Sequence, residues 1–238
     1  MRVALTRPVP PSIQHCELTH LVREPIDLAR AEAQHAAYEA LLEELGCVVH
    51  RLPLRADLPD SVFVEDAAIV TEELAIITRP GAASRRPEVD DLEAALREYR
   101  EIARIEEPGT LDGGDVLRVG ERWFVGRSSR SNDEGIRQLR RFIPAQPVDF
   151  RGCLHLKSAV TAIDGERVIL NPQWVDKLWP CIEVHPDEPF AANVLLLGGA
   201  IVAGRYPRTN ERLPNVREVD AGELAKAEGG VTCCSVIV

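Results

Sequence analysis

The feature that most constrains the fold of this chain is a unit that recurs along the sequence. Each copy reads as a strand, a tight turn, a second strand, a helix and a third strand. Four copies begin with the segments AAIVTEELAIITR (67–79), DVLRVGERWFVGR (115–127), SAVTAIDGERVILN (158–171) and NVLLLGGAIVAGR (193–205). Their starts lie roughly 35 to 48 residues apart, a period typical of repeat architectures.

Each of these hairpins is followed by a predicted helix and a third strand. The helix and strand pairs are EVDDLEAALREYR (88–100) with 102–105, DEGIRQLRRFI (133–143) with QPVDF (146–150), PQWVDKLW (172–179) with CIEVH (181–185), and RTNERLPN (208–215) with VREV (216–219). Each of the four copies therefore reads as strand, turn, strand, helix and strand.

A fifth copy is divided between the two ends of the chain. The strand CSVIV (234–238) lacks a hairpin partner, whereas RVALT (2–6), the helix DLARAEAQHAAYEALLEEL (27–45) and CVVHRLPL (47–54) supply the rest of a unit. Pairing the two terminal strands closes a ring and removes the exposed strand edges of an open array. We therefore predict an α/β fold, a five-fold pseudosymmetric α/β propeller that residues 1–238 form as a single domain.

A closed ring makes a further prediction about its centre. The residues just before the first strand of each unit are equivalent, and equivalent positions in a ring converge on its axis. In the five units they are Glu65 and Asp66, Asp112 and Asp115, His155, Asn193, and Cys233. We expect carboxylates, an imidazole and a thiol to share one layer around a central channel.

Such a set of groups is typical of nucleophilic catalysis at a cationic carbon, where a thiolate attacks, an imidazole moves protons and carboxylates hold positive charge. Taken singly, each residue has a simpler interpretation. A cysteine in an apolar strand is usually an inert core residue, which we predict for Cys234. Most of the other histidines are expected at the surface or in the core. The matching positions of Asp112, His155 and Cys233 in three units favour the catalytic interpretation for these residues.

The composition limits the partners of the chain. The formal net charge of −10 excludes a general nucleic-acid or anionic-membrane partner, because binding phosphate requires a basic field. A small cationic ligand is compatible with this negative charge. No apolar run approaches the roughly 18 residues of a membrane-spanning helix, and the first residues do not resemble a signal peptide. We expect a cytoplasmic monomer or homodimer.

The cysteines do not form a recognisable framework. Six are scattered over a chain that is too long to need disulfide staples, so none is predicted. There is no CxxC pair and no Cys/His cluster with zinc-finger spacing, so we expect no metal site. No cofactor is predicted either.

Five segments resemble a known family. They are LPDSVFVEDAAIV (58–70), ITRPGAASRRPEV (77–89), GTLDGGDVL (109–117), HLKSAV (155–160) and GGVTCCSVIV (229–238). Together they are similar to the dimethylarginine dimethylaminohydrolases, or dimethylargininases, of the guanidino-group-modifying pentein superfamily. The resemblance implies a five-fold α/β propeller, in agreement with the repeat.

The resemblance also implies roles for individual residues. Cys233 matches the nucleophile, His155 the general acid and base, and Asp112 the carboxylate that supports it. The other matches are Asp60, Glu65 and Asp66 as carboxylates that hold the guanidinium or α-amino group, Arg85 and Arg130 as arginines that grip the α-carboxylate, Leu18 as a residue of a lid over the ligand, and Ala227 as the position whose backbone carbonyl binds the amino group.

Three positions depart from the family pattern. The segment SRSN (129–132) keeps the arginine but changes its neighbours, and Ala227 is smaller than the usual aliphatic residue. The lid segment CELTHLVREP (16–25) differs from the mammalian version, which bears on substrate choice.

The activity that the resemblance implies is hydrolysis of an Nω-methylated arginine to citrulline and an alkylamine, through a covalent thiouronium intermediate on the cysteine. Two alternatives remain open at this point. One is a related enzyme such as an arginine deiminase, an amidinotransferase or a citrulline hydrolase, although HLKS differs from the HLD typical of deiminases. The other is a non-catalytic binding protein on the same ring, which the joint presence of cysteine, histidine and carboxylates disfavours.

Overall fold

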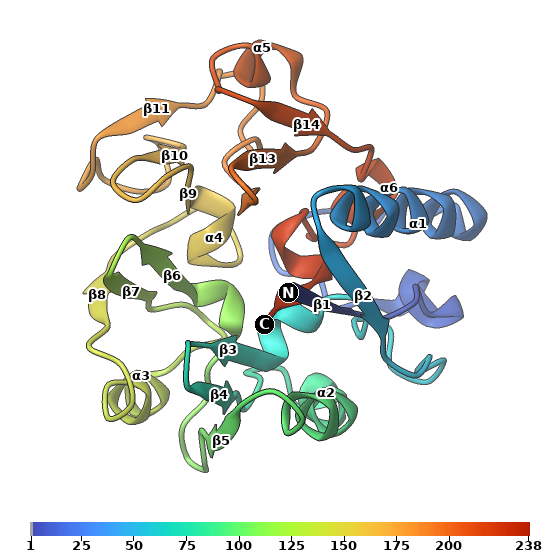
Figure 1. The fold of residues 1–238 in the computed structure, drawn as a ribbon, viewed down its shortest axis with the longest axis vertical. Helices are drawn as coiled ribbons and strands as arrows, with labels where there is room; N and C mark the ends of the chain where they lie inside the picture. Colours follow the sequence, from blue (N-terminus) through green and yellow to red (C-terminus); the bar gives the residue numbers. More distant parts are fainter. Residues whose placement is uncertain (1) are drawn as a thin grey trace.

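Five small three-stranded sheets surround a common axis in the computed structural model, which describes residues 2–238 (Figure 1). In ring order, the first sheet contains β3 (Ala68–Val70), β4 (Leu74–Ile77) and β5 (Glu101–Arg104); the second contains β6 (Val116–Val119), β7 (Arg122–Gly126) and β8 (Gln146–Val148); the third contains β9 (Val160–Ala162), β10 (Val168–Leu170) and β11 (Cys181–Glu183); the fourth contains β12 (Val194–Leu197), β13 (Ala200–Ala203) and β14 (Val216–Glu218); and the fifth contains β15 (Val236–Ile237), β1 (Arg2–Thr6) and β2 (Cys47–Arg51).

Helices and short helical turns connect the strands. The α-helices are α1 (Leu28–Glu44), α2 (Val89–Leu96), α3 (Asp133–Leu139), α4 (Leu156–Ala159), α5 (Pro207–Asn210) and α6 (Gly222–Ala225). The 3-10 turns are η1 (Pro11–His15), η2 (Val64–Ala67), η3 (Ala83–Glu88), η4 (Gly113–Asp115) and η5 (Thr232–Cys234). None of the helices within residues 2–238 is both long enough and apolar enough to cross a membrane.

All five sheets have the same pairing. In each, an inner strand runs antiparallel to the middle strand, and the middle strand runs parallel to the outer one, as for β3 with β4 and β4 with β5. In four of the sheets a tight hairpin makes the first pairing, whereas in the fifth β15 and β1 come from opposite ends of the chain. A crossover makes the second pairing in every sheet. The five-fold α/β propeller predicted from the repeat is therefore confirmed.

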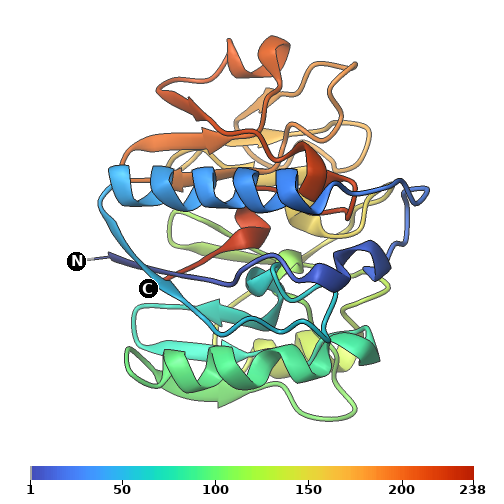
Figure 2. The same ribbon diagram turned by 90° about the vertical axis from the view of Figure 1, so that its right-hand side faces the viewer.

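The fifth sheet joins the two ends of the described chain. Ala4 of β1 lies opposite Ile237 of β15, and Leu5 lies opposite Val236. Backbone bonds between Val3 and Val238, of 3.0 and 2.9 Å, extend this pairing. Figures 1 and 2 show β1 and the last strand side by side, with the two ends close together. The predicted closure of the ring is confirmed, and both terminal strands gain a partner.

The hydrophobic core is divided among the contacts between neighbouring sheets. Successive side chains of a strand point to opposite faces, so each middle strand packs on two neighbours. Ile77 packs with Leu5 toward the fifth sheet, whereas the adjacent Ile76 packs with Val116 and Val125 of the second sheet. Five such clusters encircle the axis among the described residues. The centre of the ring is left to polar turns.

The predicted peripheral helix is present in three units, as α1, α2 and α3. α1 begins at Asp27, whose side chain accepts a bond of 3.1 Å from the backbone N–H of Arg30, and it is followed by Gly46 at φ +90°. α3 begins at Asn132, which caps the N–H of Gly135 in the same way. Figure 1 shows α1, α2 and α3 on the outside of the ring.

The helix predicted over 172–179 in the third unit is wrong. The side chain of Asn171 accepts a bond of 2.9 Å from the N–H of Gln173 and starts a turn instead. Pro180 then restricts the residue before it to extended conformations, and Val175 forms an isolated bridge with Phe150. The helix predicted in the fourth unit shrinks to the single turn α5.

Candidate active site

Short helical turns carry chemically active side chains to the axis of the ring. The turns η2, η4, α4 and η5 directly precede the inner strands β3, β6, β9 and β15. Asp66 lies on η2, Asp112 just before η4, His155 just before α4, and Cys233 on η5. Turn η2 packs against both η4 and η5, and η4 packs against α4. These four side chains share one layer of the ring.

The glycines between Asp112 and Asp115 permit this close packing. A Cβ atom on Gly113 would lie 2.0 Å from the backbone oxygen of Glu65, and one on Gly114 would lie 2.6 Å from Nδ1 of His155. Only a residue without a side chain fits at either position. The run DGGD therefore allows η4 to approach both η2 and the imidazole.

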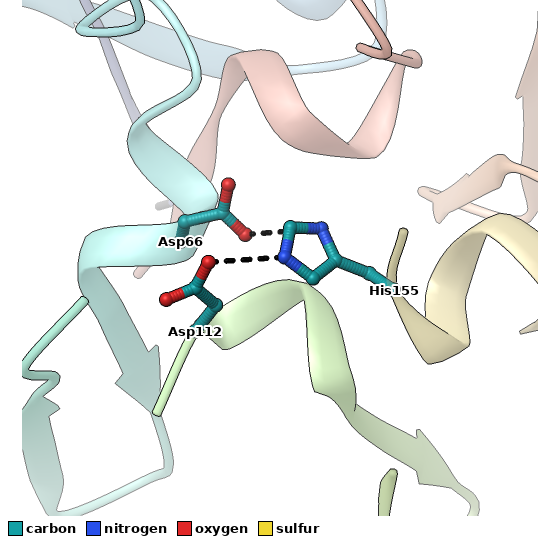
Figure 3. Close-up of side chains that lie close together, drawn as sticks. All are labelled: Asp66, Asp112 and His155. Atoms are coloured by element: carbon teal, nitrogen blue, oxygen red, sulfur yellow. Dashed lines mark hydrogen bonds and ion pairs between the residues drawn. The ribbon is translucent and has the colours of Figure 1, made fainter. Parts of the chain in front are cut away.

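Two buried carboxylates hold His155 from the same side of its ring (Figure 3). Its Nε2 lies 3.0 Å from Oδ2 of Asp112, and its Nδ1 lies 3.7 Å from Oδ1 of Asp66. The carboxylates are themselves fixed, because the N–H of Gly81 donates to Asp112 and the N–H of Gly114 donates to Asp66, both at 2.9 Å. Each ring nitrogen therefore has a fixed carboxylate near it.

This environment keeps His155 protonated. Burial disfavours the charged imidazolium, but Asp66, the hydrogen bond with Asp112 and the nearby Asp115 outweigh burial and raise the pKa of His155 to about 9. The pKa of Asp66 is correspondingly lowered; burial opposes this, but His155 and Arg85 stabilise its charge. At neutral pH the site thus holds a proton donor.

Asp115 fixes the turn that carries His155. Its Oδ1 accepts a bond of 3.0 Å from the N–H of Leu156, the first residue of α4. Its Oδ2 accepts bonds from the hydroxyls of Ser128 and Ser131, at 2.5 and 2.6 Å. Burial nevertheless raises the pKa of Asp115 to about 6.

Cys233 carries a thiol rather than a thiolate in the empty site. The N–H of Gly230 donates to its Sγ at 3.3 Å, which favours the thiolate. Burial and the negative charges of Glu65 and Asp66 have the larger effect and raise the pKa of Cys233 to about 12. A cation bound beside Sγ is therefore needed to make it a good nucleophile at neutral pH.

The neighbouring Cys234 faces the core. It is 2% exposed and belongs to the hydrophobic cluster between the fourth and fifth sheets. Its Sγ donates to the carbonyl oxygen of Gly230 at 3.5 Å, and burial raises its pKa well above the ordinary value. The two adjacent cysteines thus occupy different environments.

One pocket, with an empty volume of about 300 Å³, joins most of the residues singled out in the sequence. The predicted residues that line it are Asp60, Asp66, Arg85, Arg130, His155, Ala227 and Cys233. Asp112 stands behind His155. The two predicted arginines differ in their partners, Glu65 lies outside this pocket, and Leu18 belongs to the lid.

The two arginines differ in their partners. Arg85 is 4% exposed and donates to Asp66 at 2.7 Å and to Glu88 at 2.9 to 3.2 Å. Its remaining donors reach the backbone oxygens of Asp60 and Phe63. The side chain of Arg130 makes only a 3.3 Å contact with the hydroxyl of Thr19 among the described residues. Arg130 therefore has more donors free to meet an incoming carboxylate.

Asp60 is a hydrogen-bond acceptor in the wall of the same pocket. Its carboxylate accepts the N–H of Glu17 at 3.0 and 3.3 Å, and burial raises its pKa. It thereby connects the lid to the pocket.

Glu65 does not line the pocket that contains Cys233. Its carboxylate binds Nζ of Lys157 at 2.6 Å and the hydroxyl of Thr232 at 2.8 Å. Thr232 in turn exchanges two hydrogen bonds with Asn193, at 2.9 and 3.0 Å. Glu65 thus supports the turn that carries Cys233 from the side of the channel away from the pocket.

The lid segment (residues 16–25) is held over the pocket by Glu228. The carboxylate of Glu228 accepts the backbone N–H groups of Thr19, His20 and Leu21, at 3.0, 2.5 and 2.6 Å. Glu228 has a φ of +59°, a strained conformation for a residue with a side chain. Leu18 packs, half-buried, against the cluster that contains Ala227, next to Glu228.

Three side chains at the site carry donor atoms of the kind that bind a cation. Asp66, Asp112 and His155 bring three donor atoms within 4.8 Å of one another. These atoms already bind each other and their backbone neighbours, so the cluster is satisfied by its own hydrogen bonds.

Comparison with known proteins identifies the family. No family model matches the chain. A dimethylarginine dimethylaminohydrolase of Streptomyces coelicolor is 42% identical over 98% of this chain and 95% of its own length, and one of Pseudomonas aeruginosa is 36% identical over 88% and 89%. The chain belongs to the dimethylarginine dimethylaminohydrolase family.

Solved structures agree with this assignment. A Pseudomonas aeruginosa dimethylarginine dimethylaminohydrolase mutant in complex with citrulline superposes with a TM-score of 0.92 at 33% identity, covering 99% of this chain and 98% of that one. An arginine dihydrolase domain from cyanobacteria shares the fold at 19% identity, with a TM-score of 0.84 and coverage of 100% and 98%. The resemblance read from the five segments is confirmed.

The dimethylarginine dimethylaminohydrolase motifs identify pocket residues but not all of their supports. Sequence reasoning missed Glu88, Lys157 and Glu228. Glu88 lies three residues after Arg85, a spacing that places two side chains on one helical face and gives a usable signal. Lys157 lies inside the HLKS motif itself. Nothing in the local sequence indicates that Glu228 reaches a segment about 200 residues earlier.

Proposed function

We propose that this protein hydrolyses Nω-methylated L-arginine, both the monomethyl and the asymmetric dimethyl forms, to L-citrulline and methylamine or dimethylamine. The observation that carries the proposal is the pocket that brings Cys233 together with a protonated His155 held by Asp66 and Asp112. The names of the relatives and the citrulline complex of the Pseudomonas enzyme support the same reaction.

Charge complementarity orients the substrate. The guanidinium is cationic, and Asp66 presents a carboxylate whose pKa is lowered, so it stays ionised. Arg130 pairs with the α-carboxylate, with Arg85 nearby, and Asp60 and the carbonyl of Ala227 take the α-amino group. The lid with Leu18 covers the ligand. Such fixed charges hold both ends of an amino acid in one register.

Binding activates the nucleophile. The guanidinium replaces solvent beside Cys233 with a positive charge, which lowers the pKa of a thiol that otherwise titrates near 12. The thiol proton leaves to solvent, because His155 is already protonated. The thiolate then bonds to the guanidinium carbon.

The first product leaves by acid catalysis. The His155 imidazolium gives its proton to the methylated nitrogen as the carbon–nitrogen bond breaks, and the alkylamine departs. A thiouronium remains on Cys233. Neutral His155 then takes a proton from water, and the resulting hydroxide attacks the carbon. As the carbon–sulfur bond breaks, the new hydroxyl loses its proton to solvent, which leaves citrulline and the Cys233 thiolate.

A substrate panel tests the proposal. The protein is assayed with Nω,Nω-dimethyl-L-arginine, Nω-methyl-L-arginine, arginine and citrulline, and citrulline, ornithine, ammonia and alkylamine are measured. We expect dimethylamine and citrulline in equal amounts, and a kcat/KM at least roughly tenfold above that for arginine, since burying one or two methyl groups is worth about 1–3 kcal/mol. Preference for arginine with release of ammonia, or conversion of citrulline to ornithine, would assign a different reaction.

Paired cysteine variants locate the nucleophile. Cys233→Ser replaces the thiol with a weaker nucleophile of nearly the same size and abolishes turnover. Cys234→Ser retains substantial activity, because that side chain faces the core. Equal loss in two folded variants would place the nucleophile elsewhere.

The protein is further proposed to act in the cytoplasm as a monomer or homodimer, and to need neither a cofactor nor a metal. Its substrate is a small cationic amino acid. Activity that survives dialysis against a strong chelator is the expected result.

A further inference from the structure

A second cavity lies directly behind the reaction pocket. It is larger than the pocket that contains Cys233 and is partly open to solvent. It is lined by the loops that lead into β9, β12 and β15, with the lid residues His20 and Leu21 on one side. The two cavities share the wall residues Leu154, Glu228 and Gly229.

Two glycines line the second cavity on the side of the nucleophile. Gly229 lines both cavities, and Gly230 lines the second one while its N–H donates to Sγ of Cys233 at 3.3 Å. Neither position can carry a side chain, because a Cβ atom on Gly229 would lie 2.2 Å from the ring of Phe63 and one on Gly230 would lie 2.3 Å from Oδ1 of Asn193. At this point only backbone atoms lie between the lining of the second cavity and the nucleophile.

The lining of this cavity suits a small molecule that is partly apolar. Phe190, Tyr206, Ala225 and Val231 supply carbon surface. Its acidic residues are Glu228, in the shared wall, and Asp220, which pairs with the exposed Arg205 at 3.5 Å. None of these residues takes part in the proposed chemistry.

The order of chemical steps creates a need for such a space. The alkylamine must leave before water can attack, yet the rest of the substrate is still bonded to Cys233 and fills the pocket. The lid meanwhile remains fastened through the three bonds to Glu228. An amine that stayed beside the thiouronium carbon would attack it again and restore the substrate.

We propose that this cavity receives the departing alkylamine and supplies the hydrolytic water, while the lid stays closed. The inference rests on the proposed function. As the carbon–nitrogen bond breaks, its electron pair stays on nitrogen, which takes a proton from the His155 imidazolium, and the neutral amine passes Leu154. Water then reaches the carbon by the same path and loses one proton to His155. The sulfur leaves as thiolate, and the second proton of the water goes to solvent.

Filling the cavity tests the proposal. Ala225 lines the cavity on α6, and Ala225→Phe reduces the space without touching the reaction pocket. The matched control is Ala36→Phe on the exposed face of α1. Arginine, Nω-methyl-L-arginine and Nω,Nω-dimethyl-L-arginine release ammonia, methylamine and dimethylamine. If release limits turnover, Ala225→Phe lowers kcat about tenfold for the dimethyl substrate and less than about twofold for arginine; Ala36→Phe changes neither.

Measuring substrate affinity distinguishes a role in amine departure from a contact that the methyl groups make before reaction. In the Cys233→Ser background, Ala225→Phe should leave the Kd of Nω,Nω-dimethyl-L-arginine unchanged. A Kd that rises by the same factor as kcat falls would mean that the methyl groups already occupy the cavity before reaction, and it would overturn the exit role. An equal loss of kcat for all three substrates would also overturn it.

Two further results keep the outcomes distinct. If Ala225→Phe does not fold, Ala221→Phe fills the same cavity and is measured in the same way. If the unaltered protein releases no alkylamine from methylated arginine, the proposed function fails, and that result is visible before any cavity variant is made.

Discussion

At the level of single residues, the site contains a nucleophile, Cys233, that is a neutral thiol until a cationic substrate binds, and an acid, His155, that is already protonated. The pKa of Cys233 near 12 and that of His155 near 9 leave a neutral thiol and an imidazolium in the empty pocket at pH 7. An unoccupied site is therefore weakly reactive. The cationic substrate brings the charge that releases the thiolate.

Glu65 offers a direct test of this electrostatic control. After burial, its charge is the largest influence that raises the pKa of Cys233, whereas Lys157 lowers that pKa. Glu65→Gln should therefore lower the pKa of Cys233, and Lys157→Met should raise it. The pH dependence of alkylation of the free enzyme by iodoacetamide measures both. A large rise in KM with no change in the thiol pKa of Glu65→Gln would instead support the substrate contact implied by the resemblance.

The two arginines make separable predictions. Arg130 has few partners in the empty pocket, so Arg130→Ala should reduce kcat/KM for Nω-methyl-L-arginine about 10- to 100-fold, the range for a charged hydrogen bond of about 1.5–3 kcal/mol. Methylguanidine, which lacks the carboxylate, should lose far less. Arg85 also fixes Asp66 and Glu88, so Arg85→Ala should impair both substrates. Equal losses for the two substrates in Arg130→Ala would place the carboxylate contact elsewhere.

The residues found only in the structure explain where motif reasoning ends. HLKS, LDGGD and TCCS predict the side chains that meet at the axis, because their positions follow from the repeat. Glu88 and Glu228 act through contacts that the repeat does not encode. Glu228 binds the lid across about 200 residues of sequence, and only the closed ring brings the two segments together.

At the level of elements, hydrogen bonds join the lid to the turn that contains Glu228. Three N–H groups of the lid share a single carboxylate, and the strained φ of Glu228 aims that carboxylate. These three bonds add to the bonds between Asp60 and Glu17 and to the packing of Leu18, which also hold the lid.

Removing this carboxylate should loosen the lid. Glu228→Ala is expected to raise KM about fivefold or more, since one hydrogen bond is worth about 1 kcal/mol, and to speed amide exchange at residues 19–21. Glu24→Ala, an exposed glutamate in the same segment, is the control. Unchanged exchange at these three amides in Glu228→Ala would show that other contacts hold the lid.

The elements also show which parts of the fold are readable from sequence. Hairpins were predictable, because a short polar or glycine-containing turn separates two short apolar runs in each of them. The helix over 172–179 was not, because its apolar residues imitate helical spacing while Asn171 and Pro180 favour a turn. Local capping and tertiary packing decided between the two.

At the level of the whole molecule, the core clusters between neighbouring sheets follow one another around the ring. Every sheet shares its core with the sheets on both sides, and β15 with β1 closes the last contact. We propose on this basis that residues 1–238 unfold as a single cooperative domain. A closed ring differs in this respect from an open repeat array, whose end units can unfold separately.

A core substitution in one cluster tests this cooperativity. Leu42 is fully buried between the fourth and fifth sheets, and Leu42→Ala should lower the free energy of unfolding by about 2–5 kcal/mol. The tryptophans lie in other clusters, with Trp123 between the first and second sheets and Trp174 and Trp179 between the second and third. In a ring that unfolds as one unit, tryptophan fluorescence and far-ultraviolet circular dichroism should report the same shifted urea midpoint, because the clusters containing the tryptophans cannot persist after the cluster containing Leu42 is lost. Val22→Ala, at an exposed site, serves as the control and should leave the midpoint in place. A circular dichroism transition that moves while the fluorescence transition stays would show that the ring opens locally at the fourth and fifth sheets.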